Sequence, residues 1–398
     1  MVHDDPDASA AGVPAAELRV FADCLRAAGY TADRLKDLLR IAYPDDVGPL
    51  NRAPTLERLR SDSSPAGTLI RLFFLETDQP VRAVDRALRG TGVDWLVRHA
   101  LAGRHGTTVR PRVRVDPIGP HYCVADCRFR RFDPRALRLA GRDPVYPAGS
   151  DSVLLRETVV AGAARRVLDL CTGTGVQAFA VAAAAERAIA VDCNPRAVAV
   201  ARFNAGLNDV PGLQVRVGDL YGPVRGERFD LILANPPFVS SPYARGPGYH
   251  AGGPTGDRVL RRIVAGWRRY LAPGGRGYAI SHVGLRRGQT LEAVASGWFR
   301  GFPGRALVLH LETGSAVDLA AAQALFAIER GVSAYATEVR RWVDYLSRHR
   351  IERIAVVLIA AVQDAAGRLE VVDAHPRVLP LPLTPPPRQR VESWLAGG

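Results

Sequence analysis

The stretch that decides the fold is "VLDLCTGTGVQA", residues 167–178. An apolar run brings the chain to Asp169, a turn with Gly173 and Gly175 follows, and a helix-forming run begins directly after it. Glycine adopts positive φ without strain and lets the backbone approach a ligand at the carboxyl end of a strand. We therefore interpret this stretch as a strand, a ligand-binding turn and a helix.

The residues that follow repeat the same alternation. The strand-like runs "AIAVD", "LQVRVGDL", "FDLILANPP" and "GRGYAISH" alternate with helical runs up to about residue 285. Strands and helices at this spacing predict a parallel sheet with helices on both faces. We predict an α/β fold with a Rossmann-like sheet over residues 133–398. A two-helix insertion is expected at about 315–349, and residues 367–374 are expected to form a hairpin with the apolar strand at 353–364.

The first third of the chain has a different pattern. Helical periodicity runs from residue 15 to about residue 102, and Thr31 is a good helix N-cap in "TADRLKDLLRIA". The stretches "TTVRPRVRVDP" and "HYCVADCRF" then alternate like two strands of a hairpin. We predict a helical, winged-helix-like domain at 15–132 that presents substrate or makes a dimer contact, after a disordered leader at 1–14.

Composition excludes several classes of protein. No secretory signal begins the chain, and the longest uncharged apolar run, residues 354–362, is too short to span a bilayer. The five cysteines are scattered without a CxxC pair, which is typical of reduced thiols and argues against a disulfide framework or a zinc site. We therefore expect a cytoplasmic protein with no membrane partner and no metal ligand set.

The net charge of +13 invites a nucleic-acid partner. However, Lys36 is the sole lysine and the arginines are spread along the chain, which favours a coding bias toward arginine. The charge alone does not decide between a nucleic-acid partner and a protein partner.

Two further strands end in a carboxylate. Asp192 closes "AIAVD" and Asp219 closes "VRVGDL", so with Asp169 three acidic strand ends share one predicted edge of the sheet. Gly173, Gly175 and the small residue Ala178 also satisfy the dinucleotide-binding spacing. An acidic residue before the turn would repel a pyrophosphate but would attract an ammonium group. The pattern therefore argues against a dinucleotide.

With these motifs in this order, residues 145–285 resemble the class I S-adenosylmethionine-dependent methyltransferases, and in particular the release-factor glutamine N5-methyltransferases. The resemblance implies S-adenosyl-L-methionine as cofactor. It implies that Asp169 and the turn surround the methionine part, that Asp192 holds the ribose, and that Asp219 with Leu220 meets the adenine. The cofactor residues implied are Asp169, Cys171, Thr172, Gly173, Gly175, Asp192, Asn194, Asp219, Leu220 and Asn235.

The strand "FDLILA" ends in Asn235-Pro236-Pro237-Phe238, which resembles the signature of methyltransferases that act on planar nitrogens. The resemblance implies that these four residues are catalytic. A conjugated NH2 is a poor nucleophile, and acceptors on the Asn235 carboxamide and the Pro236 carbonyl would orient it. Proline fixes φ and so holds that carbonyl in place, while Phe238 offers a ring face for stacking.

The ends of the chain are similar to a group of actinobacterial methyltransferases with a helical front domain and inserted helices. We predict an N-methyltransferase whose acceptor is a protein side-chain amide or amine. The alternatives are a nucleobase amine of RNA or DNA, a small molecule of a biosynthetic pathway, and a non-catalytic cofactor-binding regulator. The substrate partner is thus a protein or a nucleic acid, with protein favoured, and the inserted helices could also serve a homodimer.

Overall fold

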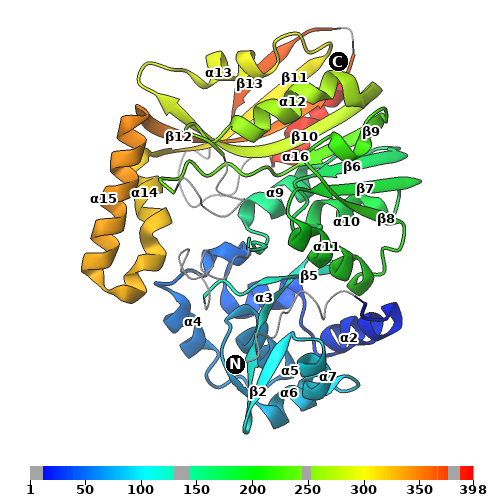
Figure 1. Ribbon diagram of the computed structural model, residues 1–398, viewed down its shortest axis with the longest axis vertical. Helices are drawn as coiled ribbons and strands as arrows, with labels where there is room; N and C mark the ends of the chain where they lie inside the picture. The colour runs from blue at the N-terminus through cyan, green and yellow to red at the C-terminus, as the bar shows by residue number, and fades with distance from the viewer. Residues whose placement is uncertain (1–11, 130–142, 244–251, 365, 375–385, 398) are drawn as a thin grey trace. The chain divides into compact units, whose positions relative to one another are not determined.

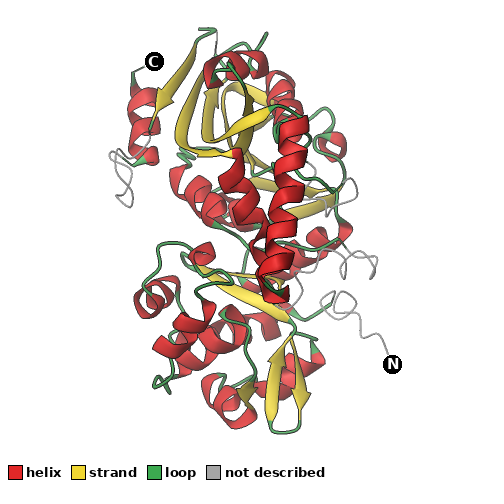
Figure 2. Cartoon of the chain, turned by 90° about the vertical axis from the view of Figure 1, so that its left-hand side faces the viewer, coloured by secondary structure: helices red, strands yellow, loops and turns green. Residues whose placement is uncertain are grey.

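The computed structural model describes residues 12–129, 143–243, 252–364, 366–374 and 386–397 (Figure 1). Most of the predicted leader, residues 1–11, lies outside the described residues. The chain divides into two compact units. Unit 1 contains residues 1–153, 172–179 and 194–215, and unit 2 contains residues 154–171, 180–193 and 216–398. Helices and strands of both units are coloured by type in Figure 2. The predicted boundary at residue 132 stays a prediction.

Unit 1 begins with short helices, as the periodicity predicts. Their bounds are α2 Ala15–Ala27, α3 Ala32–Leu39, α4 Arg52–Arg58, α5 Pro65–Leu69, α6 Val81–Ala87 and α7 Gly92–Arg98, with single turns at Pro44–Asp46 and Ile70–Phe74. The side chain of Thr31 accepts a hydrogen bond from the backbone N–H of Arg34 at 3.2 Å, which confirms the predicted N-cap of α3. Buried side chains of these helices, including Phe21, Leu25 and Phe73, form one core.

The strands of unit 1 form two small sheets. Strands β1 (Gln79–Pro80), β3 (Thr108–Pro111) and β2 (Ala102–His105) form an antiparallel sheet in that order, while β4 (Val113–Ile118) pairs with β5 (His121–Asp126). The run "TTVRPRVRVDP" is therefore two strands, and the predicted hairpin is confirmed only for the second of them, β4, which pairs with β5. The winged-helix interpretation stays a prediction.

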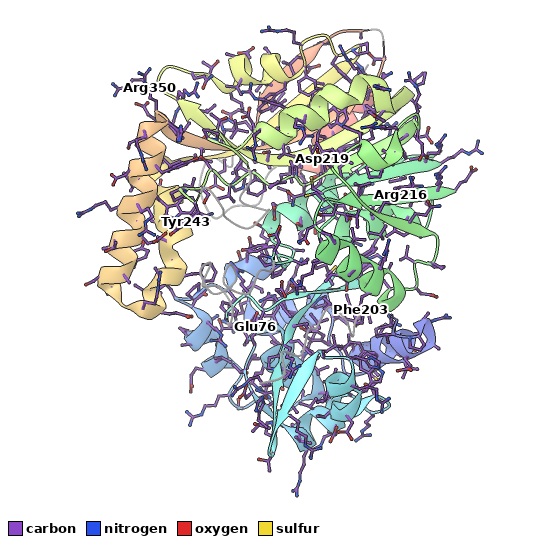
Figure 3. The ribbon with its side chains drawn as sticks, in the orientation of Figure 1. Glu76, Phe203, Arg216, Asp219, Tyr243 and Arg350 are labelled. Atoms are coloured by element: carbon purple, nitrogen blue, oxygen red, sulfur yellow. The ribbon has the colours of Figure 1, made fainter. Side chains whose placement is uncertain are left out.

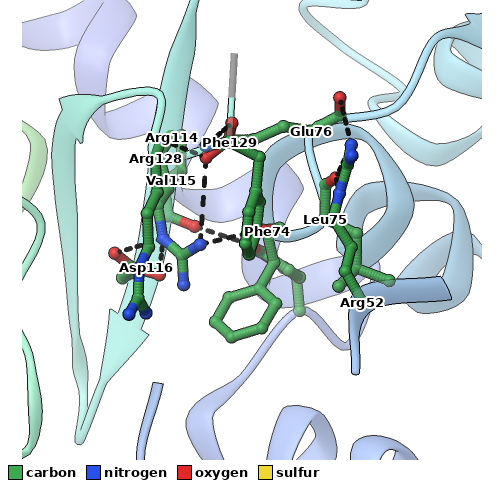
Figure 4. Close-up of polar contacts among 10 residues, drawn as sticks. Arg52, Phe74, Leu75, Glu76, Arg114, Val115, Asp116, Arg128 and Phe129 are labelled. Carbon is green, nitrogen blue, oxygen red and sulfur yellow. Dashed lines mark hydrogen bonds and ion pairs between the residues drawn. The ribbon is translucent and has the colours of Figure 1, made fainter. Parts of the chain in front are cut away.

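A buried charge cluster lies in the core of unit 1 (Figure 4). Arg114, 1% exposed, donates from Nε to both carboxylate oxygens of Asp116 at 2.7 and 2.9 Å and from Nη1 to the carbonyl of Phe74 at 2.9 Å. Glu76 is also buried and accepts the backbone N–H groups of Arg128 and Phe129. Each buried charge is thus paired or hydrogen-bonded, which offsets the cost of removing it from water.

The large sheet confirms the predicted Rossmann-like α/β class. Its strand order is β13-β11-β12-β10-β9-β6-β7-β8, and neighbours among β7, β6, β9 and β10 pair in parallel. Its strands are β6 Arg166–Leu170, β7 Arg187–Asp192, β8 Leu213–Val217, β9 Phe229–Ala234, β10 Leu271–Arg286, β11 Arg305–Ser315, β12 Ile351–Val362 and β13 Leu369–Asp373. The helices of this part of the chain are α9 Ser150–Thr158, α10 Val176–Ala182, α11 Pro195–Leu207, α12 Arg258–Tyr270, α13 Leu291–Trp298, α14 Ala316–Ala324, α15 Val332–Arg348 and α16 Pro387–Ala396, with single turns at Gly222–Val224 and Leu325–Arg330.

The last strand pairs differently from the prediction. Strand β13 does not form a hairpin with β12; it pairs in parallel with β11, in the register Val308↔Val371. Both edges of β12 are already occupied, by β10 and β11 in antiparallel pairings, so the remaining edge of β11 accepts β13. The two-helix insertion is present as α14 and α15, which lie side by side (Figure 1). Among the described residues, no helix combines the length and the apolar character that a bilayer crossing needs.

Candidate active site

Strand register brings the predicted site residues of unit 2 to one edge of the sheet. Leu170 at the end of β6 pairs with Val191 of β7 and with Ala234 of β9. The next residue on each of these strands is therefore Cys171, Asp192 or Asn235. Parallel neighbours end at the same edge, so the glycine-turn strand, the acidic strand and the Asn-Pro-Pro-Phe strand present their tips together.

The charges that act on the Cys171 thiol show which sign of charge gathers at this edge of the sheet. The pKa of its thiol is raised well above the ordinary value, first by burial and then by the charges of Asp192, Asp169 and Asp219 and by the thiol of Cys193. Cys171 also has a left-handed φ of 58°, unusual for a non-glycine residue. Carboxylates that act together on one thiol create a negative potential, which suits a cationic ligand. These carboxylates suit the positively charged sulfonium and ammonium groups of S-adenosylmethionine, and they can accept hydrogen bonds from its ribose hydroxyls.

Asp219 lies beside Asp192 because the backbone N–H of Gly218 donates to the carbonyl of Asp192 at 2.9 Å. The Asp219 carboxylate, labelled in Figure 3, forms an exposed ion pair with Arg262 of α12 at 2.6 Å. Its neighbour Leu220 is 7% exposed, has a left-handed φ of 47°, and packs in the core of unit 2. Sequence reasoning missed Arg262, since nothing in a single sequence pairs it with Asp219.

The glycine turn belongs to unit 1. The backbone N–H of Gly175 donates to the carbonyl of Thr172 at 2.8 Å, which closes the turn, and Gly173 has a φ of 53°. A Cβ on Gly175 would lie 2.4 Å from the ring of Phe179, so glycine is required there for packing. Asn194, predicted to bind cofactor, caps helix α11 by accepting the N–H of Arg196 at 2.9 Å.

The Asn235–Phe238 tip of unit 2 is packed against a histidine. The rings of Phe238 and His282 are stacked, with centroids 4.1 Å apart and planes at 20°. His282 lies within β10, three residues beyond Ala279, and Ala279 pairs in parallel with Ala234 at the end of β9, so His282 and the tip lie at one edge. Sequence spacing contains no signal for this pair, because 44 residues separate the two rings along the chain (282 − 238).

Two glycines that follow the tip in the chain, Gly252 and Gly256, pack against the backbone of the tip. A Cβ on Gly252 would lie 2.5 Å from the carbonyl carbon of Phe238, and one on Gly256 would lie 2.6 Å from the Phe238 oxygen. The loop ends at Asp257, which is 1% exposed and accepts the indole N–H of Trp298 at 2.8 Å. These contacts hold the tip in one conformation.

A small pocket adjoins Phe238. Its lining combines the tip, the covering loop, β10, β12 and helix α14, and its residues are Phe238, Val239, Ser240, Thr255, Gly256, His282, Gly284, Leu319, Gln323 and Ile354. No charged side chain occurs among these lining residues, all of which belong to the described ranges. The pocket is therefore suited to an uncharged, planar or apolar group.

The inserted helices are bound to the segment that follows the tip. The hydroxyl of Tyr243, which is labelled in Figure 3, donates to the carboxylate of Glu338 on α15. Arg341 donates to the same hydroxyl oxygen at 3.0 Å. The ring of Tyr243 meets Trp342 edge-on at 6.3 Å. The insertion therefore packs against the segment that follows the tip, and its helix α14 also contributes Leu319 and Gln323 to the pocket lining.

Comparisons with known proteins agree with this geometry. Residues 148–297 match the family "Methyltransferase small domain", and residues 27–112 match a domain of unknown function. A release factor glutamine methyltransferase of Cereibacter sphaeroides is 36% identical over 205 residues, which cover 48% of this chain and 69% of the relative. A ribosomal protein uL3 glutamine methyltransferase of Burkholderia pseudomallei is 37% identical over 131 residues, covering 27% of this chain and 42% of the relative.

Three other release factor glutamine methyltransferases are matched over 44–49% of their length, so the chain spans about half the length of these relatives. Among solved structures, phosphoethanolamine N-methyltransferase 2 of Haemonchus contortus in complex with S-adenosyl-L-methionine is 15% identical, with a TM-score of 0.36. That alignment covers 65% of this chain and 63% of the other.

Proposed function

This chain belongs to the class I S-adenosylmethionine-dependent methyltransferase family that includes the release factor glutamine methyltransferases, and from this premise we propose that it methylates a glutamine side-chain amide of a protein. The observation that carries the proposal is the register that brings the Asn-Pro-Pro-Phe tip and the acidic strand ends to one sheet edge. An acceptor held at the tip would then lie at the same edge as a cofactor held by the carboxylates.

The cofactor, when bound, supplies an electrophilic methyl group on a sulfonium. Asp169 would accept hydrogen bonds from its ammonium group, Asp192 would accept them from its ribose hydroxyls, and Asp219 with Leu220 would meet its adenine. Thr172, Gly173 and Gly175 offer backbone groups, since no side chain or a short one covers them. Asn194 is proposed as a further cofactor residue, and its side-chain oxygen also caps α11.

The acceptor nitrogen is oriented by the tip. The Asn235 carboxamide oxygen and the Pro236 carbonyl accept the two N–H hydrogens of a planar NH2, which directs the nitrogen toward the methyl group. Pro236 and Pro237 limit the backbone to one conformation, so these acceptors need no rearrangement during the reaction. Phe238, supported by His282, stacks on the plane of the amide. Most of the catalysis is positioning of the two reactants.

A protein amide is favoured over a nucleobase by two observations. The pocket beside Phe238 has no arginine or lysine among its described lining residues, so it offers no cationic side chain to pair with a nucleic-acid phosphate. The two relatives described above are named as glutamine methyltransferases, one of a release factor and one of ribosomal protein uL3. The substrates named for these relatives are translation proteins, so we place this activity in the cytoplasm.

Transfer of a radiolabelled methyl group into fractionated cell protein, RNA and small molecules tests the proposal. Wild type should label protein, and base-stable N-methylglutamine should be recovered after enzymatic digestion. Asn235→Ala should abolish labelling. Label in small molecules alone, or cofactor binding without any transfer, would contradict the proposed acceptor or the proposed catalysis respectively.

The net charge of +13 favours a second candidate, a nucleobase amine of RNA. Binding through phosphates releases counterions, so affinity would fall steeply with salt. Labelled RNA in the same fractionation, together with RNA affinity that drops sharply between low and physiological salt, would support this candidate. Salt-independent or absent RNA binding would remove it.

A further inference from the structure

Two asparagines of helix α11 bind strand β5 through their side chains in unit 1. Asn208 accepts the backbone N–H of Tyr122 at 2.7 Å and donates to the Tyr122 carbonyl at 2.7 Å. Asn204 does the same with Val124, at 2.9 and 3.0 Å. Four residues of helix rise about 6 Å and two residues of strand about 6.6 Å, so the two carboxamides match alternate residues of the strand.

The third hydrogen bond distinguishes the two asparagines. Asn208 donates to the carbonyl of Asn204 in its own helix at 2.7 Å. Asn204 donates instead to the carbonyl of Thr174 at 2.9 Å, inside the glycine turn. Asn204 is fully buried at 0% exposure, so water does not replace this donor.

The bond to Thr174 fixes one peptide group of the turn. The Thr174 carbonyl and the Gly175 N–H belong to the same peptide unit, and that N–H donates to the Thr172 carbonyl at 2.8 Å. Both polar ends of the unit are therefore engaged, one by the turn and one by Asn204. Without Asn204 the carbonyl would be buried with an unmade hydrogen bond, which favours rotation of the peptide.

We propose that Asn204 is a positioning residue for the cofactor turn, and that through it the β4–β5 hairpin sets the turn's conformation. This inference rests on the proposed function, because it assumes that residues 172–175 bind S-adenosylmethionine. Asn204 acts through the turn and not by contact with the cofactor. It acts by selecting the peptide orientation that the turn presents.

Asn208 supplies a matched control. Asn204→Ala and Asn208→Ala each remove three hydrogen bonds, two of them to β5, but the first alone removes the bond to Thr174. Calorimetric titration with S-adenosylhomocysteine should give an affinity about tenfold weaker for Asn204→Ala, or about 1.4 kcal/mol. Asn208→Ala should stay within about twofold of wild type. Equal losses in the two variants, or no loss in Asn204→Ala, would overturn the proposal.

Hydrogen exchange of the Gly175 amide gives a readout without cofactor. Exchange should accelerate in Asn204→Ala and stay near the wild-type rate in Asn208→Ala. If Asn204→Ala does not fold, Asn204→Leu replaces it, since an apolar side chain of similar size fills the buried space but cannot donate to Thr174; Asn208→Leu is its control. Failure of wild type to bind S-adenosylhomocysteine would count against the proposed function, and unchanged Gly175 exchange would count against the role of Asn204.

Discussion

At the scale of single residues, His282 supports the proposed acceptor site, because its ring stacks on the ring of Phe238. We expect His282→Ala to lower kcat/KM for the acceptor about threefold to tenfold, since an aromatic pair contributes about 0.5–1.5 kcal/mol and Phe238 would lose its support. His282→Phe keeps a stacking ring and should retain most of the activity. Steady-state kinetics, with S-adenosylhomocysteine affinity as the control, measure this. Unchanged kcat/KM in His282→Ala would show that the pair is dispensable.

Arg114 is the residue on which the core of unit 1 depends most. Arg114→Ala leaves the Asp116 carboxylate buried without its partner, so we expect the free energy of unfolding to fall by about 3–5 kcal/mol. Arg110 provides the comparison, because its ion pair with Asp78 is largely exposed. Arg110→Ala should cost less than about 1 kcal/mol. Denaturant unfolding of both variants checks the difference, and similar losses would contradict the role assigned to burial.

At the scale of elements, helix α14 is expected to limit what enters the pocket beside Phe238. Leu319→Trp places a large ring in the pocket lining and should raise the KM for the acceptor about tenfold or more, with cofactor affinity unchanged. Val317 lies on the same helix and is 56% exposed, so Val317→Trp is the matched control and should leave KM unchanged. Comparable KM values for the two variants would exclude the insertion from acceptor selection.

Predictions about single helices are confirmed where they depend on residues that are close together in the chain. The Thr31 cap and the helices of the insertion follow from residues within a few positions of each other. The hairpin assigned to β12 and β13 is wrong because the choice of strand partner depends on which sheet edges are already occupied. Helix α16 was not predicted, since a proline-rich stretch before it hides its start.

At the scale of the whole molecule, buried tyrosines in both units make stability depend on alkaline pH. Burial raises the pKa of Tyr122 to about 12, and it raises the pKa values of Tyr30 and Tyr221 well above their ordinary value. Above pH about 10 the unfolded chain loses these protons while the folded chain keeps them. The free energy of unfolding should therefore fall as pH rises from about 10 toward 12.

Denaturant unfolding at a series of pH values measures this slope. Tyr122→Phe removes one titrating group and should make the fall with pH less steep than in wild type. The same slope in both proteins would mean that Tyr122 does not contribute. Stability below pH 9 provides the baseline for each protein, so a packing effect of the substitution is separated from the effect of titration.

The sequence by itself determined the α/β class, the acidic strand ends and the Asn-Pro-Pro-Phe tip, because strand periodicity, glycine turns and prolines act over a few residues. Tertiary structure decided the strand order, in which β6 pairs with both β7 and β9 and so brings the three strand tips together. Tertiary structure alone decided that His282 stacks on Phe238, that α14 lines the pocket, and that Asn204 holds the Thr174 carbonyl. These contacts join residues far apart in the chain, and no short-range preference specifies which distant side chains share a buried space.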